Sequence, residues 1–251
     1  MARIKLNSLD TRAPKKLSKE QTKHALQKLQ FRLGELQNLL YAESKHAVLV
    51  ILQGMDASGK DGVVKNVFKE VNPIGCRVIP FKRPTDLEMK HDFLWRVHQQ
   101  VPEKGIIHVF NRSHYEDVLI QRVHKWIDEK TVKQRFTHIN NFEKLLQESG
   151  TVVFKFYLHV SKEEQLQRLK ERMSDPTKMW KHNDTDLKER EFWNDYMKAY
   201  EDVFDNCGTS AAWNIIPADQ NWYKEYLIAK KVVETLESLK MKFPGLKTGT
   251  P

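Results

Sequence analysis

Residues 54–62 of the chain, with the sequence GMDASGKDG, contain the residue types that bind phosphate groups. They have the G-x-x-x-x-G-K skeleton of a phosphate-binding loop and directly follow the apolar run Ala47–Leu52. The glycines let the backbone bend so that several N–H groups point inward, the following helix offers the positive end of its dipole, and Lys60 adds a mobile cation. An ordinary glycine-rich turn is the alternative. We predict that a polyphosphate chain or nucleotide binds here, through Gly54, Ala57, Ser58, Gly59, Lys60, Asp61 and Gly62.

Two carboxylates depart from the usual phosphate-loop pattern. Asp61 stands where ATP-using proteins carry a Ser or Thr that ligates magnesium, and Asp56 lies inside the anion-binding loop. A carboxylate among phosphates is repulsive unless a divalent cation lies between them. The sequence therefore predicts Mg²⁺ as the cofactor, with Mn²⁺ as a possible substitute.

Apolar runs of strand length alternate with helical patterns from residue 46 onward, which is typical of an α/β fold with a parallel sheet between two layers of helices. The predicted strands are Ala47–Leu52, Arg77–Phe81, Ile106–Phe110, Val152–Val160 and Trp213–Ile216. The predicted helices after residue 46 are Asp86–Gln100, Asp117–Glu148, Ser161–Met173, Asp186–Asp205 and Asn221–Lys242. Ligands of such sheets gather at the carboxyl ends of the strands.

Charged side chains follow the second and third predicted strands. Lys82 and Arg83 come directly after the second, and Arg112, Glu116 and Asp117 come after the third. A carboxylate at this position holds magnesium in nucleotide-binding folds. Asp117 is the favoured second metal ligand beside Asp56, and Glu116 is its competitor. The two acids could instead complement the dipole of a helix that begins there.

The helix after the fourth strand presents Arg168 and Arg172 on one face, and a polar, basic segment with Lys178 and Lys181 follows it. We interpret residues 168–187 as a lid that closes over phosphates and excludes water. An exposed turn is the alternative.

The composition agrees with an anionic partner. Lys and Arg number 42 against 33 for Asp and Glu, giving a net charge of +9 and a pI near 9.3. Cys76 and Cys207 form neither a disulfide framework nor a cysteine zinc site, which indicates a reducing, cytoplasmic location. Neither a secretion signal nor a membrane-spanning run is found in the sequence.

The predicted organisation has three parts. Residues 1–45 form a basic arm and an amphipathic helix, residues 46–243 form the phosphotransferase domain, and residues 244–251 form a tail. The helix carries a leucine stripe from Leu26 to Leu40. This stripe could serve assembly or pack on its own domain, and the pattern favours neither.

Four blocks in this order make the chain resemble the second family of polyphosphate kinases: GMDASGKDG, FKRPT at 81–85, FNRSHYED at 110–117, and the basic lid. The resemblance covers about residues 49–243. It implies a P-loop kinase-like fold and reversible, magnesium-dependent phosphoryl transfer between inorganic polyphosphate and a nucleoside mono- or diphosphate. It also implies that Asp56 and Asp117 hold magnesium and that Lys82, Arg83, Arg112, Arg122, Arg168 and Arg172 line the polyanion path.

The candidate catalytic residues are Asp56, Lys60, Arg112, Asp117 and Arg172. The second hypothesis is an ATP-dependent nucleoside monophosphate kinase of the thymidylate kinase type, which the missing hydroxyl after Lys60 disfavours. The third is a nucleic-acid-binding protein, which the scattered tryptophans disfavour. Adenine and guanine nucleotides stay open, as do a dimer and a tetramer. We expect no binding to membranes or nucleic acid.

Overall fold

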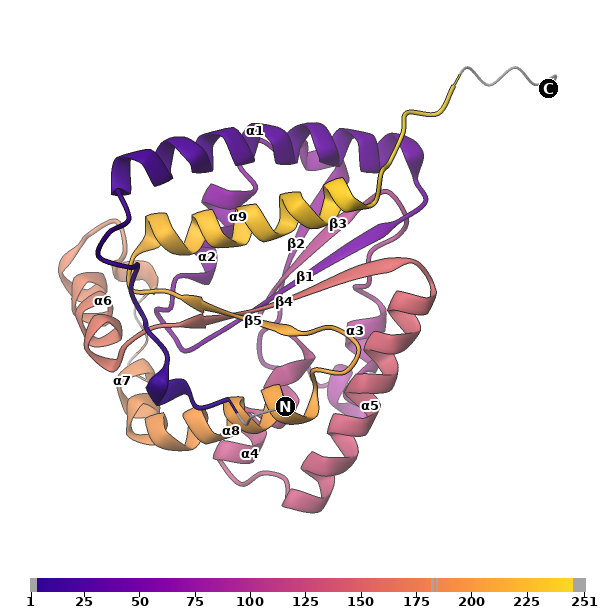
Figure 1. Ribbon diagram of the computed structural model, residues 1–251. Coiled ribbons are helices and arrows are strands. Elements are labelled where there is room, and N and C mark those ends of the chain that lie inside the picture. Colours follow the sequence, from indigo (N-terminus) through magenta and orange to yellow (C-terminus); the bar gives the residue numbers. More distant parts are fainter. Residues whose placement is uncertain (1–3, 182, 184, 246–251) are drawn as a thin grey trace.

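The computed structural model describes residues 4–181, 183 and 185–245. Its centre is a sheet of five parallel strands in the order β2-β3-β1-β4-β5 (Figure 1). The strands are β1 (Ala47–Gln53), β2 (Cys76–Pro80), β3 (Ile107–Asn111), β4 (Thr151–His159) and β5 (Trp213–Pro217). Each one begins and ends within one residue of the predicted range. The α/β fold with a parallel sheet is therefore confirmed.

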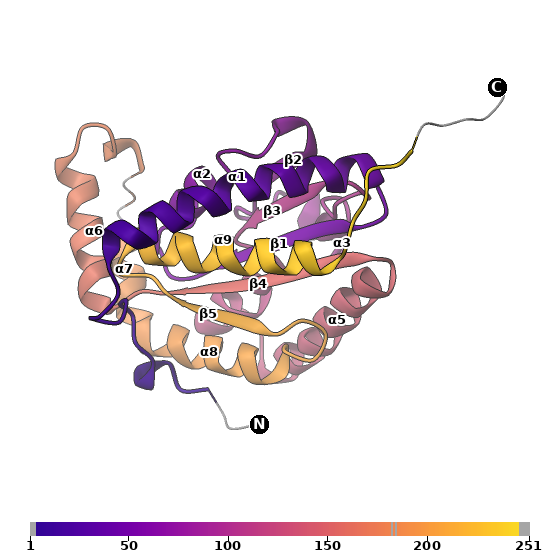
Figure 2. The same cartoon turned by 45° about the horizontal axis from the view of Figure 1, so that its top comes forward.

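Helices cover both faces of the sheet, which gives the three predicted layers. One face carries α1 (Lys19–Glu43), α2 (Lys60–Val67) and α9 (Asn221–Ser238), and the other carries α4 (Ile120–Val123), α5 (Glu129–Glu148) and α8 (Trp193–Asn206), as Figures 1 and 2 show. The remaining α-helices are α3 (Trp95–His98), α6 (Lys162–Ser174) and α7 (Thr185–Glu189). Short 3-10 helices are η1 (Leu6–Ser8), η2 (Pro73–Gly75), η3 (Glu88–Lys90), η4 (His114–Val118), η5 (Met179–Lys181) and η6 (Arg190–Phe192).

The core lies on both sides of the central strands. Every residue of β1 is buried, and β4 is buried except at Val152. A parallel strand that is covered on both faces needs this continuous apolar run rather than an alternating one. β2 is an edge strand and contains only exposed and half-buried residues. No helix among the described residues is long and apolar enough to cross a membrane.

The N-terminal helix α1 shares this core. The Ser18 side chain accepts a hydrogen bond from the N–H of Gln21 and caps the helix. Leu26, Leu33, Leu36 and Leu40 are buried, and the helix lies along α9 of the same chain (Figure 2). Of the two possible uses of the leucine stripe, the structure shows packing on the chain's own core.

The segment before α1 also lies against the domain. The backbone N–H of buried Leu6 donates to Glu201 on α8 at 2.9 Å, and the N–H of Ala13 donates to Gln220 at 2.8 Å. The predicted basic arm is thus extended but docked over residues 4–18.

Three predicted helices are divided into shorter ones in the structure. In 86–100, the Asp92 carboxylate accepts the N–H of Leu94, and only η3 and α3 form. In 117–148, Lys125 has a positive φ of 57°, and Asp128 caps a new helix, α5. In 186–205, a 3-10 turn separates α7 from α8. The prediction for 221–242 overran the end of α9 at Ser238.

A fully buried ionic cluster joins β4, α5 and η4. The Nζ of Lys155 donates to Glu143 Oε2 at 2.6 Å and to the carbonyl of Cys207 at 2.5 Å, and the Tyr115 hydroxyl donates to Glu143 Oε1 at 2.6 Å. Lys155 and Glu143 have no exposed surface. Burial alone would raise the pKa of Glu143, but His114 and Lys155 hold it below its usual value. The cluster fixes η4, which begins three residues after β3.

The cluster makes a stability prediction. Lys155→Met should lower the free energy of unfolding by about 3–5 kcal/mol, because it leaves the Glu143 carboxylate buried without its cation. The double variant Lys155→Met, Glu143→Leu should recover a large part of that loss. Urea unfolding of the single and double variants measures both effects.

The exposed pair Lys144–Glu148, with an N···O distance of 3.7 Å on α5, supplies the control. Lys144→Met should cost less than about 1 kcal/mol. Equal costs for Lys144→Met and Lys155→Met would show that the buried cluster does not stabilise the fold in this way.

Candidate active site

The loop from β1 to α2 has the backbone that a phosphate-binding loop requires. Gly54 and Gly59 have positive φ angles of 148° and 96°. A Cβ on Gly54 would lie 2.9 Å from the carbonyl oxygen of Leu158, so β4 passes too close for any side chain. Lys60 then begins α2, whose N-terminus faces the carboxyl ends of the strands.

Side chains hold the carbonyl groups of this loop. Lys60 Nζ donates to the carbonyls of Gly54 at 2.7 Å and Met55 at 3.2 Å. Gln165 on α6 donates to the carbonyl of Asp56 at 3.0 Å. The N–H of a trans peptide points opposite to its C=O. Because these hydrogen bonds fix the carbonyl groups toward Lys60 and Gln165, the N–H groups of the same peptides point away from those two side chains.

Arg168 on α6 is the strongest of these supports. Its Nη1 donates to the carbonyls of Ala57 and Ser58, both at 3.1 Å, and its Nη2 donates to those of Ala218 and Asp219 at 2.8 and 2.9 Å. Its Nε donates to Glu164. All five N–H groups of the guanidinium are thus engaged. The structure gives Arg168 a supporting role that the sequence did not predict, and its role as a phosphate ligand stays a prediction.

Arg112 connects the loop to the segment after β3. It has a positive φ of 65°, and its guanidinium contacts Asp56 and lies 3.3 Å from Glu116. Burial would raise the pKa of Asp56, but Arg112, Lys60 and Arg172 together hold it below its usual value. Burial and the charge of Arg112 lower the pKa of Lys60 to about 8. Two carboxylates and two cations thus meet at the mouth of the loop.

A cavity of ≈ 630 Å³ lies over this loop. We name it the phosphate-loop cavity. Its walls include Asp56, Ala57, Gly59, Lys60, Asp61, Gly62, Lys82, Asn111, Arg112, Glu164, Arg168, Glu171, Arg172 and Lys178. Asp61 accepts a hydrogen bond from Asn111 at 2.9 Å. The structure therefore brings the predicted loop residues together with cations from three other segments.

A second cavity of ≈ 870 Å³ adjoins the first and shares Phe81, Lys82 and Arg112 with it. We name it the aromatic cavity, because Phe81, Phe93 and Trp126 line it together with Met89 and Ile120. Its charged walls are Arg83, Glu88, Asp92, Arg96, Glu116, Asp117 and Arg135. A cavity with apolar walls and a few charged groups is typical of a small-molecule site.

Asp117 faces the aromatic cavity rather than the loop. It is buried, Gln121 donates to it, and Arg96 lies 3.8 Å from it. Burial raises the pKa of Asp117 to about 6 against the opposing charges of Arg96 and Arg135. Its Oδ2 has no hydrogen-bond partner among the described residues.

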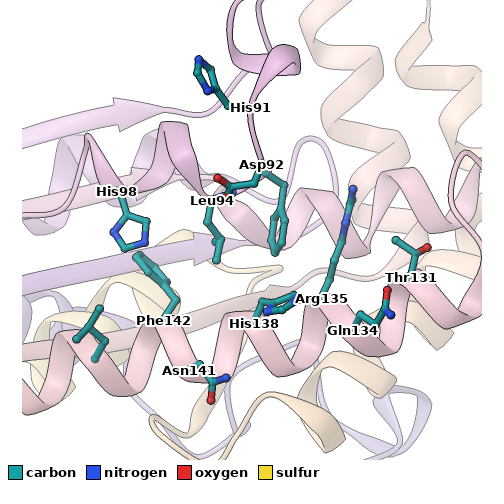
Figure 3. Close-up of a pocket in the computed structure, with 12 residues that line it drawn as sticks. His91, Asp92, Leu94, His98, Thr131, Gln134, Arg135, His138, Asn141 and Phe142 are labelled. Carbon is teal, nitrogen blue, oxygen red and sulfur yellow. The ribbon is translucent and has the colours of Figure 1, made fainter.

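Arg135 separates the aromatic cavity from a third cavity of ≈ 650 Å³, shown in Figure 3. Its guanidinium donates to the carbonyl of Asp117 at 2.7 Å and lies 4.9 Å from the ring centre of Phe93. In Figure 3 it extends from α5 toward the 91–98 segment. Arg135 thereby fixes the backbone of Asp117 from the side that faces away from the loop.

The carboxylates of this site fit the cation predicted from the sequence. Asp56, Glu116 and Asp117 offer the hard oxygen atoms that Mg²⁺ and Mn²⁺ prefer, and the buried Oδ2 of Asp117 is an acceptor without a donor. Over the residues that the structure describes, no group of three or more His, Cys, Asp or Glu forms a metal cage. Magnesium needs only one or two carboxylates, since it keeps several waters and phosphate oxygens.

The predicted basic residues fall into different places. Arg172 borders the phosphate-loop cavity and pairs with Asp186 at 3.0 Å, and Lys178 borders it and pairs with Asp175 at 3.0 Å. Arg122 lines neither cavity and is paired with Glu129 and Asp202 instead. The side chain of Lys181 lies outside the described residues.

The predicted lid, 168–187, consists of the second half of α6, the turn with η5, and α7, with residues 182 and 184 outside the described part. Its first part is anchored, because Arg168 donates hydrogen bonds to carbonyl groups of the phosphate loop. Closure of the remainder over a ligand stays a prediction.

A parallel sheet with a phosphate loop after its central strand, and with a second cavity beside it, defines a phosphotransferase of the P-loop kinase-like class. Residues 16–244 match the family described as Polyphosphate kinase 2. The chain belongs to the polyphosphate kinase 2 family.

Known relatives cover nearly the whole chain. It is 49% identical to an AMP/ADP-polyphosphate phosphotransferase of Meiothermus ruber, over 92% of this chain and 87% of the relative. It is 43% identical to an ADP-polyphosphate phosphotransferase of Rhodopseudomonas palustris, over 90% and 83% of the two chains. The crystal structure of Polyphosphate Kinase 2 from Arthrobacter aurescens superposes with a TM-score of 0.95 at 39% identity, over 100% of this chain and 91% of that one.

The support of the loop leads to a testable prediction. Arg168→Ala should lower the free energy of unfolding by about 2–4 kcal/mol, because it leaves several buried carbonyls without a charged donor. Arg172→Ala, one turn later on α6, removes one partly exposed ion pair and should cost about 1 kcal/mol or less. Urea unfolding of the two variants checks the difference. Equal costs would contradict the supporting role of Arg168.

Proposed function

We propose that this chain catalyses reversible, magnesium-dependent phosphoryl transfer between inorganic polyphosphate and a nucleoside mono- or diphosphate. The observation that carries the proposal is the junction of two unlike cavities at Arg112, one built on the phosphate loop and one with aromatic walls. The relative from Meiothermus ruber is named as an AMP/ADP-polyphosphate phosphotransferase and the one from Rhodopseudomonas palustris as an ADP-polyphosphate phosphotransferase.

Each cavity suits one substrate. The phosphate-loop cavity takes the polyphosphate chain, because loop amides and the side chains of Lys60, Arg172 and Lys178 surround it. The aromatic cavity takes the nucleotide, since Phe81, Phe93 and Trp126 give it the apolar, aromatic walls that suit a purine base. Lys82 and Arg112 border both cavities, so the phosphoryl group is transferred beside these two side chains.

Phosphoryl transfer needs positioning and charge stabilisation more than covalent chemistry. Arg112 is held in place by Asp56 and Glu116, so it is preorganised for the negative charge of the group in transit. Arg172 lies on the lid side of the same cavity and should act most strongly in the transition state.

The metal in this proposal would be held by Asp56 of the phosphate-loop cavity and Asp117 of the aromatic cavity, with Glu116 as the alternative second ligand. Bound there, Mg²⁺ would neutralise phosphate oxygens and orient the transferring group. The chain's own part is to supply oxygen ligands at fixed positions: Asp56 on the loop, and Asp117 on η4, which the buried Lys155–Glu143 pair anchors.

The second candidate is an ATP-dependent nucleoside monophosphate kinase. Asp61 disfavours it, because a carboxylate that accepts from Asn111 replaces the neutral hydroxyl of ATP-using loops. The names of the relatives favour polyphosphate as the phosphate donor.

Product analysis separates the two candidates. The protein is mixed with Mg²⁺, polyphosphate and each of AMP, ADP, GMP and GDP without ATP, and products are measured by chromatography. We expect polyphosphate-dependent phosphorylation of adenine nucleotides at least. The apparent affinity for polyphosphate should weaken as salt rises, since a polyanion releases counterions when many cations bind it.

A parallel reaction with ATP and AMP, without polyphosphate, serves as the control. Phosphorylation of AMP from ATP combined with no reaction from polyphosphate would favour the second candidate. Product with guanine nucleotides would extend the substrates to both purines.

The metal ligands make a separate prediction. Asp56→Asn and Asp117→Asn should each lower turnover by about a hundredfold or more at saturating magnesium, because the transferring group loses its metal-centred compensation. Glu116→Gln should have the smaller effect if Asp117 is the second ligand. Initial rates over a magnesium titration measure this.

Glu148→Gln at the exposed end of α5 removes a carboxylate that lines none of the three cavities and should leave the rate unchanged. Near-normal turnover of Asp56→Asn would show that this residue is not a metal ligand. A larger loss in Glu116→Gln than in Asp117→Asn would assign the second position to Glu116.

The proposal includes a homo-oligomer, a dimer or a tetramer, in the cytoplasm. Exposed apolar side chains at Tyr41, Ile74 and Val78, beside the edge strand β2, support a contact between copies. Light scattering coupled to gel filtration measures the assembly.

A further inference from the structure

Lys224 on α9 lies behind the phosphate loop with no exposed surface. Its Nζ donates to the carbonyls of Ser58 at 3.2 Å and Gly59 at 3.4 Å, and to Asn221 Oδ1 at 2.9 Å. None of the ion pairs found among the described residues includes it. Burying an ammonium group that contacts only neutral oxygen atoms has a large desolvation cost. Its place behind the loop therefore suggests that it serves the function of the loop.

Gly59 and Lys224 constrain each other. A Cβ on Gly59 would lie 2.2 Å from Lys224 Nζ, closer than any real contact. Gly59 therefore leaves the space that the ammonium group fills, in addition to allowing the positive φ of 96°. Arg168 comes within 3.6 Å of the same point, so α6 and α9 place two cations behind the loop.

We propose that Lys224 is a positioning residue for the phosphate loop, and that it responds to the loop's ligand by gaining a proton when a phosphate chain binds. It holds the Ser58 and Gly59 carbonyls toward α9, so that the amides of the same peptides point toward the phosphate-loop cavity. The proposal deepens the proposed function and rests on it for the identity of the ligand.

The charges around Lys224 explain the response. Burial, the nearby Arg168 and Lys60 at the start of α2 lower the pKa of Lys224, Glu225 and Glu164 oppose the shift, and together these effects bring the pKa to about 7. In the free protein the group therefore loses its proton as the pH rises through about 7. Phosphates in the loop favour the charged form and raise the pKa. Binding should then take up a proton and weaken as the pH rises above about 7.

Calorimetric titration with tripolyphosphate in the presence of EDTA tests this without catalysis. Repeating the titration at pH 7.5 in two buffers of different ionisation enthalpy gives the number of protons taken up. We expect Lys224→Met to bind about tenfold more weakly, which corresponds to one lost charge-assisted interaction, and to take up fewer protons than the wild type. Protonation of Lys60 and of tripolyphosphate itself is common to all proteins, so the difference isolates Lys224.

Two further variants make the test specific. Lys224→Gln keeps a donor toward the carbonyls without the charge, so it should bind more tightly than Lys224→Met but show the same reduced proton uptake. Lys230→Met, on an exposed part of α9, should match the wild type in both quantities. Thermal unfolding of each variant shows that the fold is kept.

Each outcome bears on one proposal. Wild-type affinity and wild-type proton uptake in both Lys224 variants would overturn the inference, and so would a wild type that takes up no proton. A weaker affinity with unchanged proton uptake would reduce Lys224 to a structural role and also overturn it. No binding of tripolyphosphate to the wild type, either in EDTA or in a repeat titration with Mg²⁺ in its place, would instead contradict the proposed function.

Discussion

The structure around the site depends on one constraint: the loop after β1 must turn its carbonyl groups away from the anion and into the protein, so that its N–H groups can face the anion. Carbonyls turned into the protein need donors, because an unpaired buried acceptor costs about 1–3 kcal/mol. Lys60, Gln165, Arg168 and Lys224 supply them from α2, α6 and α9. The two outer elements must therefore be in place before the loop can take its shape. This couples the phosphate site to helices far apart in the sequence.

The same arrangement concentrates positive charge. Lys60 and Lys224 both have lowered pKa values, to about 8 and about 7, and burial is the largest cause in each case. Arg112 adds a further positive charge, which is paired with the carboxylates of Asp56 and Glu116. These two carboxylates neutralise only part of the positive charge around the loop, and a bound polyanion would neutralise the rest. The loop is thus assembled for a ligand with more negative charge than the protein itself provides.

The sequence predicted those parts that local patterns determine. Buried parallel strands are continuous apolar runs, so β1 and β4 were located within one residue. The phosphate loop has a fixed spacing of glycines and lysine. The helix breaks at Asp92 and Asp128 depend on side chains that bond to nearby backbone, which periodicity does not detect. Lys224 could not be found at all, because on an amphipathic helix a buried lysine looks like any surface lysine.

Two buried lysines show why the remaining parts of the site could not be predicted without the tertiary structure. Lys155 on β4 is paired with Glu143 and fixes η4, which carries Glu116 and Asp117. Lys224 has only neutral oxygens and fixes the loop. The paired lysine is electrically satisfied and can serve a permanent element, whereas the unpaired one can respond to an arriving charge. In the proposed reaction, the element that carries Asp117 is therefore rigid, the phosphate loop is responsive, and Arg112 lies at the junction of the two cavities.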